Sequence, residues 1–441
     1  MIEILFDRFL MGFSLFIHII LASLGMALPV FILIAEYLGI RKFDNYYTVI
    51  AKRFSIVLAV LFAIGTASGS LVAVNITVLW PKFMALIGQV AIAPFYIEVF
   101  AFFLETIFLA IYLYSWGKLP KEKHMLLMIP VVIGGALSAM LITMINAFMN
   151  TPSGFNVNAY LANGTLTGID PLAVFNTPST WIEVSHVLST SYLAGFTILA
   201  AYFAIKTFLS KEEEKSKYYK KSLAILIPLC MIAAIFAIYS GLSSIATLMN
   251  LQPEKFAAIE ANLNPMSNAP EMIGGIFFNG SYHYYFLIPR LQSLLATGSF
   301  NGTVPGLNQF PTSTWPPLIV HIMFDLLVFI GFAIGIAMLL LVFMYFLKID
   351  ILSDWRAHAL LVLSALGSVF LLENGWVMSE LARQPWIIYN VMLVSDAANP
   401  SAVILPISVL IFLFYLAIIP LTCIVLIRIM SARDLSKELT Q

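Results

Sequence analysis

Charged residues are scarce in this chain. Asp, Glu, Lys and Arg make up 10% of its 441 residues, whereas an ordinary soluble domain has about 25%. Hydrophobic residues make up 61% and the formal net charge is zero, so the chain lacks the broad basic surface that nucleic-acid binding requires. We therefore predict a protein of the lipid membrane that does not bind nucleic acid.

Cysteine is also nearly absent. The two cysteines, Cys230 and Cys423, each lie inside an apolar run. In that setting cysteine behaves as a small hydrophobic residue. We expect both to be buried packing residues rather than a disulfide or a metal-binding pair.

Long apolar runs, in contrast, are abundant. About 20 apolar residues are needed to cross the bilayer core as a helix, and nine runs qualify. They are 9–38, 54–80, 94–115, 124–149, 179–205, 221–249, 316–347, 357–379 and 402–428. The sequence predicts an all-α polytopic membrane protein with nine transmembrane helices. It divides into helices one to six (1–249), a polar loop (250–315) and helices seven to nine (316–441).

Lys and Arg are distributed unevenly between the links that join these runs. The links after the first, third and fifth runs are rich in cations, and 206–221 alone holds six lysines. The alternate links 150–178, 250–315 and 380–401 hold none, two and one. Because cations favour the cytoplasmic side, we expect the N-terminus outside and the C-terminus in the cytoplasm. The 250–315 loop then lies outside. It shows no clear regular structure, and such a long loop is often functional.

One His and one Met lie at a similar depth in separate runs. His186 is about 10 Å into the fifth run and Met323 about 10 Å into the seventh, at 1.5 Å per residue. An imidazole and a thioether on opposite faces of a porphyrin make a low-spin haem. The alternative is a His hydrogen-bonded between helices and a Met that only fills space.

Further ionisable residues lie at a comparable depth. His18 is in the first run, Glu98 in the third and Glu373 in the eighth. Such residues are costly in hydrocarbon and usually have a function there. They suggest iron with an open coordination position, although interhelical hydrogen bonds remain the alternative.

A second carboxyl follows on the third run. Glu105 lies seven residues beyond Glu98 and nearly on the same helix face. Both Glu105 and Ser138, which is on the fourth run, lie near mid-membrane. A carboxyl and a hydroxyl at that depth can pass protons. Glu105 bonded to a backbone carbonyl is the alternative.

Six segments carry a family resemblance. They are RFLMGFSLFIHIILASLGMA, IEVFAFFLE, WIEVSHVLSTSYLAGF, QPEKFAAIEAN, HIMF and LLENGWVMSELARQPW. In this order they resemble subunit I of the cytochrome bd quinol oxidases, over nearly the whole chain. The resemblance implies that His186 and Met323 ligate a low-spin haem b. It implies that His18, Glu98 and Glu373 ligate the iron of a high-spin haem b and of haem d or a second high-spin haem b.

The same resemblance assigns the remaining site residues. Arg383 is expected near haem propionates, and Lys255 and Glu260 are expected to contact quinol. Glu98 and Glu105 are the candidate catalytic carboxyls. The candidate residues for proton passage from the cytoplasm are Glu105, Thr106 and Ser138.

The chain departs from the family pattern at three places. Glu98 and Glu105 are seven residues apart, where familiar members have eight. VAVNITVLW stands where the family has EFQFGTNW, and His321 stands in place of an Arg.

The resulting prediction is a haem-containing subunit of a quinol:oxygen oxidoreductase in a prokaryotic cell membrane. It oxidises quinol at the outer face, reduces oxygen to water, takes up protons from the cytoplasm and works with a second membrane subunit. One alternative is a haem-bearing paralogue that transfers electrons or supports a partner without reducing oxygen. Another is a proton-coupled secondary transporter.

Overall fold

The computed structural model describes residues 2–401, 404–432 and 434–440. Among these residues, nine helical segments are long and apolar enough to cross a membrane, as the sequence predicted. They are α1 (Ile2–Lys42), α2 (Asn45–Leu79), α4 (Ala93–Tyr114), α5 with α6 (Lys121–Leu126, Met128–Asn150), α8 (Thr180–Leu209), α9 (Glu213–Leu251), α12 (Val320–Phe346), α13 (Trp355–Leu381) and α15 (Ile404–Ala432). The ninth predicted run began at residue 402. Residues 402 and 403 lie outside the described residues.

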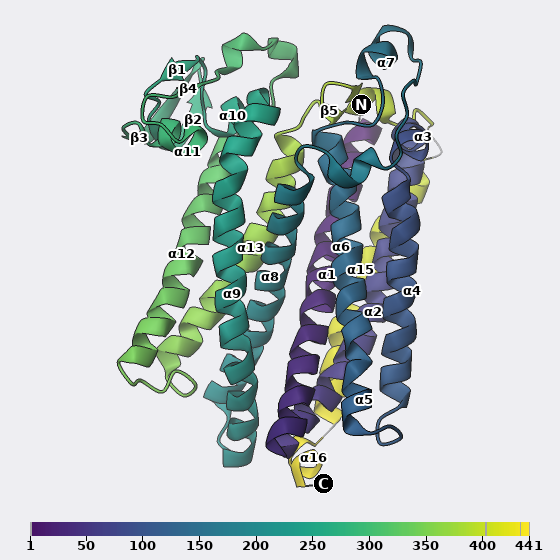
Figure 1. Cartoon of the computed structure of the whole chain (residues 1–441), viewed down its shortest axis with the longest axis vertical. Coiled ribbons are helices and arrows are strands. Elements are labelled where there is room, and N and C mark those ends of the chain that lie inside the picture. Colours follow the sequence, from purple (N-terminus) through teal and green to yellow (C-terminus); the bar gives the residue numbers. More distant parts are fainter. Residues whose placement is uncertain (1, 402–403, 433, 441) are drawn as a thin grey trace.

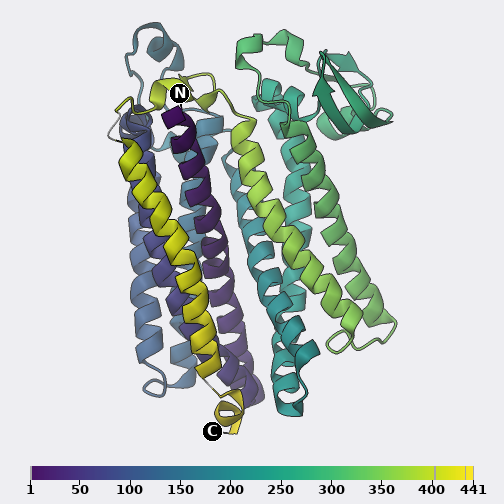
Figure 2. The ribbon, with the colours of Figure 1, turned by 180° about the vertical axis from the view of Figure 1, so that it is seen from behind.

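The long helices form two groups of four. One group contains α1, α2, α4 and α6, and the other contains α8, α9, α12 and α13. The helix α15 packs along α2 and α1 (Figures 1 and 2). The groups meet where α1 crosses α8. There a Cβ on Gly195 would lie 2.4 Å from the Cβ of Ala27, so only glycine allows this close approach.

The bundle has two chemically different ends. Four links between helices lie at one end, here called the lysine end. They are 43–44, 115–120, 210–212 and 347–354. Two of these links contain acidic residues that cap the next helix. Asp44 accepts a hydrogen bond from the amide of Tyr46 (3.0 Å), and Asp354 accepts one from Arg356 (2.8 Å). The opposite end, which carries the 250–315 segment, is called the loop end.

Short elements complete the chain, most of them at the loop end. The helices are α3 (Pro81–Val90), α7 (Val157–Asn163), η1 (Ala173–Asn176), α10 (Pro253–Ile259), α11 (Leu291–Thr297), η2 (Leu307–Gln309), η3 (Thr312–Thr314), α14 (Val394–Ala397) and α16 (Leu435–Thr440). Three antiparallel strand pairs accompany them: β1 (Met266–Ser267) with β4 (Thr303–Val304), β2 (Glu271–Phe278) with β3 (Ser281–Ile288), and β5 (Trp386–Ile388) with β6 (Met392–Leu393).

The 250–315 segment is folded, and the expectation that it lacks regular structure is wrong. It contains α10, α11 and the β2–β3 hairpin (Figure 1). The hairpin turns at Asn279 and Gly280, whose φ angles are 51° and 82°. Asn-Gly favours this turn because both residues tolerate positive φ. The dipeptide, flanked by aromatic residues, was the sequence signal for the hairpin.

Both cysteines are free. Cys230 is buried, as predicted, whereas Cys423 is exposed on α15. The expectation of burial is therefore wrong for Cys423. The reason is the position of α15, which packs on the bundle along one side only.

Candidate functional site

His18 on α1 is held by a Ser-Gly pair of α2. Its Nδ1 lies 3.0 Å from Ser68 Oγ, and the Ser68 hydroxyl donates to the carbonyl of Gly65 (2.8 Å). Because the hydroxyl proton is used there, Nδ1 of His18 carries the ring proton and donates it to Ser68. Its Nε2 then keeps a free lone pair, the form in which His binds a metal. Gly69 makes room for the ring, since a Cβ there would lie 2.9 Å from Cε1.

His186 on α8 has the same arrangement in the other helix group. Its Nδ1 lies 2.9 Å from Ser240 Oγ, and the Ser240 hydroxyl donates to the carbonyl of Phe236 (2.8 Å). Nδ1 is again the protonated nitrogen, which leaves the Nε2 lone pair free. A Cβ on Gly241 would lie 3.4 Å from Cε1. Each histidine is therefore oriented by a Ser-Gly pair on the next long helix.

Met323 and Glu373 belong to neighbouring helices. Asn374 on α13 donates its side-chain amide to the backbone carbonyl of Met323 on α12 (2.9 Å). The adjacent Glu373 is buried, and its Oε1 has no hydrogen-bond partner among the described residues. Leaving a buried carboxyl oxygen unpaired is costly, so this atom is available to a bound group.

The two carboxyls of α4 face α6. Ser138 donates to Glu98 Oε1 (2.8 Å), which joins two predicted residues directly. Glu105 is buried against the glycines of α6, because a Cβ on Gly135 would lie 3.6 Å from its Oε1. The Thr106 hydroxyl donates to the carbonyl of Phe102 on its own helix (2.7 Å). The hydroxyl oxygen of Thr106 can therefore accept another hydrogen bond, but its proton is already donated.

A buried polar cluster lies between α13 and α8 at the loop end. Arg383 is 1% exposed and donates from Nη1 to the Asn150 side chain (3.0 Å) and from Nη2 to Glu380. Asn150 in turn donates to Glu183 (3.0 Å). The Nε of Arg383 is buried without a partner in the described chain.

Lys255 on α10 joins this cluster. It is 5% exposed and donates to the hydroxyl of Ser379 (3.3 Å). Burial, followed by repulsion from Arg383, lowers the pKa of Lys255 to about 8. Glu183 and Glu380 act in the opposite direction by attracting its charge. Lys255 can therefore exist as a cation or a neutral amine near neutral pH.

Glu260 has an acidic neighbour that the sequence reasoning missed. Burial first, and then the charge of Glu271, raises the pKa of Glu260 well above its usual value. Burial raises the pKa of Glu271 to about 7, while its hydrogen bond with Glu260 acts the other way. Glu260 Oε2 also accepts from the Gln292 side chain (2.9 Å). Burial raises the pKa of both carboxyls, so this pair can take up a proton near neutral pH.

His321 connects α12 to the 250–315 segment. Its Nδ1 lies 2.7 Å from the carbonyl of Ile259 and its Nε2 lies 2.7 Å from the carbonyl of Gly274. Carbonyl oxygens only accept, so the ring of His321 is the donor toward α10 and β2. Asp325 Oδ2 lies 3.7 Å from Nε2.

The structure brings some predicted residues together and leaves others apart. Glu98 contacts Ser138, and Lys255 lies in the electrostatic cluster of Arg383. No described hydrogen bond or ion pair joins His186 to Met323 or His18 to Glu373. Those pairings remain predictions. The missed residues Glu183 and Glu380 each lie three positions before a predicted residue, inside segments already singled out.

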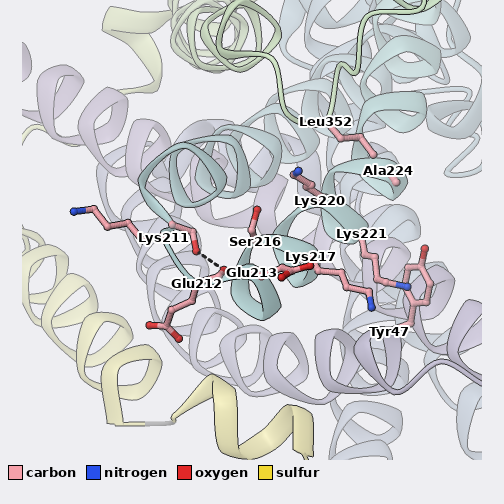
Figure 3. A pocket seen from close by; sticks show the side chains of 11 residues that line it. Tyr47, Lys211, Glu212, Glu213, Ser216, Lys217, Lys220, Lys221, Ala224 and Leu352 are labelled. Atoms are coloured by element: carbon pink, nitrogen blue, oxygen red, sulfur yellow. Dashed lines mark hydrogen bonds between the residues drawn. The ribbon is translucent and has the colours of Figure 1, made fainter.

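A pocket at the lysine end, with a volume of 590 Å³, is separate from these residues. Figure 3 shows the lysines that line it, from the link before α9 and from the first turns of α9. Lys221 pairs with Asp44, and its ammonium also lies 4.9 Å from the ring centroid of Tyr47. This pocket belongs to the cation-rich surface of the bundle.

The family assignment follows from comparison with known proteins. Residues 6–434 match the family model described as cytochrome bd terminal oxidase subunit I. The chain belongs to this family. It is therefore a multi-pass membrane subunit of a quinol oxidase, from a family that carries haem and serves respiratory electron transport. The transporter alternative has no support in this assignment.

Similar proteins are found among bacterial bd oxidases. A Bacillus subtilis protein, provisionally described as a cytochrome bd menaquinol oxidase subunit I, is 33% identical over 405 residues, covering 90% of each chain. The B. subtilis cytochrome bd ubiquinol oxidase subunit 1 is 24% identical, covering 91% of this chain and 87% of the relative. The solved bd oxidase structure from Geobacillus thermodenitrificans is 35% identical with a TM-score of 0.89. That match covers 98% of this chain and 99% of the other.

The described side chains fit haem. The Nε2 lone pairs of His18 and His186 are free to ligate iron, and Glu373 has an unpaired buried oxygen. The buried Arg383 has an unpaired Nε that suits a propionate. No cluster of three or more His, Cys, Asp or Glu within the described ranges could hold a bare metal ion.

Proposed function

We propose that this chain is the haem-bearing, quinol-oxidising and oxygen-reducing subunit of its complex, with the loop end outside the cell. The observation that carries the proposal is the arrangement at His18 and His186. In each helix group a Ser hydroxyl selects the tautomer whose Nε2 can bind iron. If these histidines only linked helices, neither would need a free Nε2, yet both have one.

His186 and Met323 would hold a low-spin haem b. His18, Glu98 and Glu373 would serve a high-spin haem b and haem d, or two high-spin haems b. Bound haem supplies one-electron transfer and, where the iron has an open face, oxygen binding. Arg383 would pair with a propionate through its free Nε.

Quinol would be oxidised at the carboxyl pair of the loop end. Glu271, the member of the pair that ionises near neutral pH, accepts a proton from quinol and shares it with Glu260. Lys255 supplies an ammonium donor to a quinol oxygen. Its burial keeps this donor in place and away from bulk water.

Protons for water would move along α4 from the lysine end. Glu105 lies twelve residues, or about 18 Å, from the first residue of α4, which is near mid-membrane. It can hold a proton and release it toward Glu98, whose carboxylate is already oriented by Ser138. The Thr106 hydroxyl oxygen can accept a hydrogen bond from a proton donor on the same route. Because proton release and uptake occur on opposite faces, the reaction builds a membrane potential.

A second membrane subunit would complete the complex. The family works as a multi-subunit assembly, and the identity of the partner of this chain belongs to the proposal. The remaining alternative is a haem-bearing paralogue that transfers electrons or supports a partner without reducing oxygen.

Spectroscopy of the purified complex tests this proposal. We expect low-spin and high-spin haem bands, and carbon monoxide should bind the reduced protein and shift the high-spin bands. Met323→Leu should convert the low-spin haem toward high spin, because the thioether ligand is lost. Met338→Leu, at a buried Met of the same helix, is the matched control and should leave the spectrum unchanged.

Two results would contradict parts of the proposal. A low-spin spectrum with no carbon monoxide complex would favour the paralogue. An unchanged spectrum in both Met323→Leu and His186→Ala would exclude the assigned ligand pair.

A further inference from the structure

The β2–β3 hairpin lies outside the helix bundle, yet its surface is apolar. Residues 272–289 contain no Asp, Glu, Lys or Arg, although Glu271 and Arg290 flank them directly. Large apolar side chains of this hairpin are exposed. They are Ile273, Ile276, Tyr284, Tyr285, Phe286 and Leu287, with exposed fractions from 40% to 84%. An exposed apolar patch of this kind normally marks a contact surface.

The depth of the hairpin follows from its hydrogen bonds to α12. The amide of Gly274 donates to Asp325 (2.5 Å), and its carbonyl accepts from His321 (2.7 Å). His321 lies one position and Asp325 five positions from the first residue of α12, or about 1.5 and 7.5 Å along the helix. The hairpin backbone therefore runs beside the first turns of this spanning helix.

Those first turns lie at the membrane boundary. The 27 residues of α12 extend about 40 Å, whereas the hydrocarbon core is about 30 Å thick. Roughly 5 Å at each end of α12 thus lies among lipid headgroups. The hairpin contacts these turns through Gly274 and projects sideways at the loop end of the bundle (Figure 2).

We propose that the β2–β3 hairpin lies in the headgroup region of the loop-end leaflet and contacts lipid with its exposed aromatic and aliphatic side chains. Tyr rings favour this zone because they combine an apolar ring with a polar hydroxyl. Phe329 on α12 is also exposed. It lies one helical turn beyond Asp325, which bonds the hairpin, and so extends the apolar surface along that face of the helix. This proposal does not depend on the proposed function.

Spin labelling of the full complex in lipid vesicles tests the proposal. Cys423 is replaced by Ala, and the buried Cys230 is left in place. Single labels are placed at Phe286→Cys and, in a second variant, at Tyr284→Cys, the most exposed of the six apolar side chains named above. Asn163→Cys on the exposed helix α7 of the loop end is the aqueous control. Spin-labelled lipids calibrate the depth.

The measured quantity is the ratio of collisions with oxygen to collisions with a water-soluble nickel chelate. We expect both hairpin labels to show a ratio several-fold above that of Asn163→Cys and close to that of a headgroup-labelled lipid. A ratio equal to the aqueous control would overturn the proposal, because the hairpin would then lie in water. Labels that are immobile and shielded from both reagents would also overturn it, since a protein partner would then cover the hairpin.

Discussion

At the scale of single residues, the candidate site depends on hydrogen bonds that select one form of each side chain. Ser68 and Ser240 have no ionisable group, yet each decides which nitrogen of a histidine is free. Such a partner also tunes the ligand, because a hydrogen bond from Nδ1 makes Nε2 a stronger electron donor.

Ser240→Ala tests this tuning. Loss of the acceptor should weaken electron donation by His186 and raise the midpoint potential of the low-spin haem. One hydrogen bond is worth about 1 kcal/mol, which corresponds to about 40 mV for one electron. Ser222→Ala, at a buried Ser of α9 that bonds only its own helix, should leave the potential unchanged. A redox titration in which both variants match the parent protein would refute the role of Ser240.

The carboxyl pair makes a prediction about pH. The pKa of Glu271 is raised to about 7, so Glu271 is protonated below pH 7 and cannot accept a proton from quinol. The quinol oxidation rate should therefore rise as the pH increases through about 7. It should fall again above about 8, where Lys255 loses its charge.

In Glu271→Gln the rise near pH 7 should disappear, whereas the fall near pH 8 should remain. Glu254→Gln changes another buried carboxyl of the same segment and should keep the full profile. Steady-state rates between pH 5.5 and 9.5 measure both. A Glu271→Gln profile identical to that of the parent would rule out Glu271 as the acceptor.

At the scale of elements, α12 links the proposed low-spin haem ligand Met323 to the proposed quinol segment. His321 binds carbonyls of α10 and β2 from a position two residues before Met323. A side chain with two nitrogens suits this position because it contacts two backbone carbonyls of the loop. An Arg at this position, as in the family pattern, can do the same.

His321→Leu should loosen the hairpin. One hydrogen bond is worth about 1 kcal/mol, so loss of the bonds to α10 and β2 should accelerate amide exchange in β2 about tenfold. His321→Arg should largely preserve protection. His358→Leu, which removes a similar His-to-carbonyl bond at the lysine end, should leave β2 unaffected. Hydrogen exchange followed by mass spectrometry resolves these peptides, and unchanged β2 exchange in His321→Leu would contradict the link.

At the scale of the whole molecule, the helix bundle has two chemically distinct ends. The lysine end collects the basic links, which predicts that it faces the cytoplasm. The loop end carries the carboxyl pair and the apolar hairpin. Orientation therefore decides on which side quinol protons are released.

Cysteine labelling in intact cells tests this orientation. In a background with Cys423→Ala, Asn163→Cys should react with an impermeant maleimide added outside, because α7 is exposed at the loop end. Lys211→Cys, in an exposed link of the lysine end, should react only after the membrane is permeabilised. Reversal of the two results would invert the topology and the proposed proton movements.

The sequence alone determined the nine spans, the clustering of basic links at one end, and the candidate residues of the site. These features are local, because an apolar run of sufficient length needs only its own composition to enter a membrane. Only the tertiary structure decided how those residues are held. Ser68 lies 50 positions from His18, and Ser240 lies 54 positions from His186, so helix packing had to bring them together. The same holds for the hairpin, whose depth is set by its bonds to a helix about 50 residues farther along the chain.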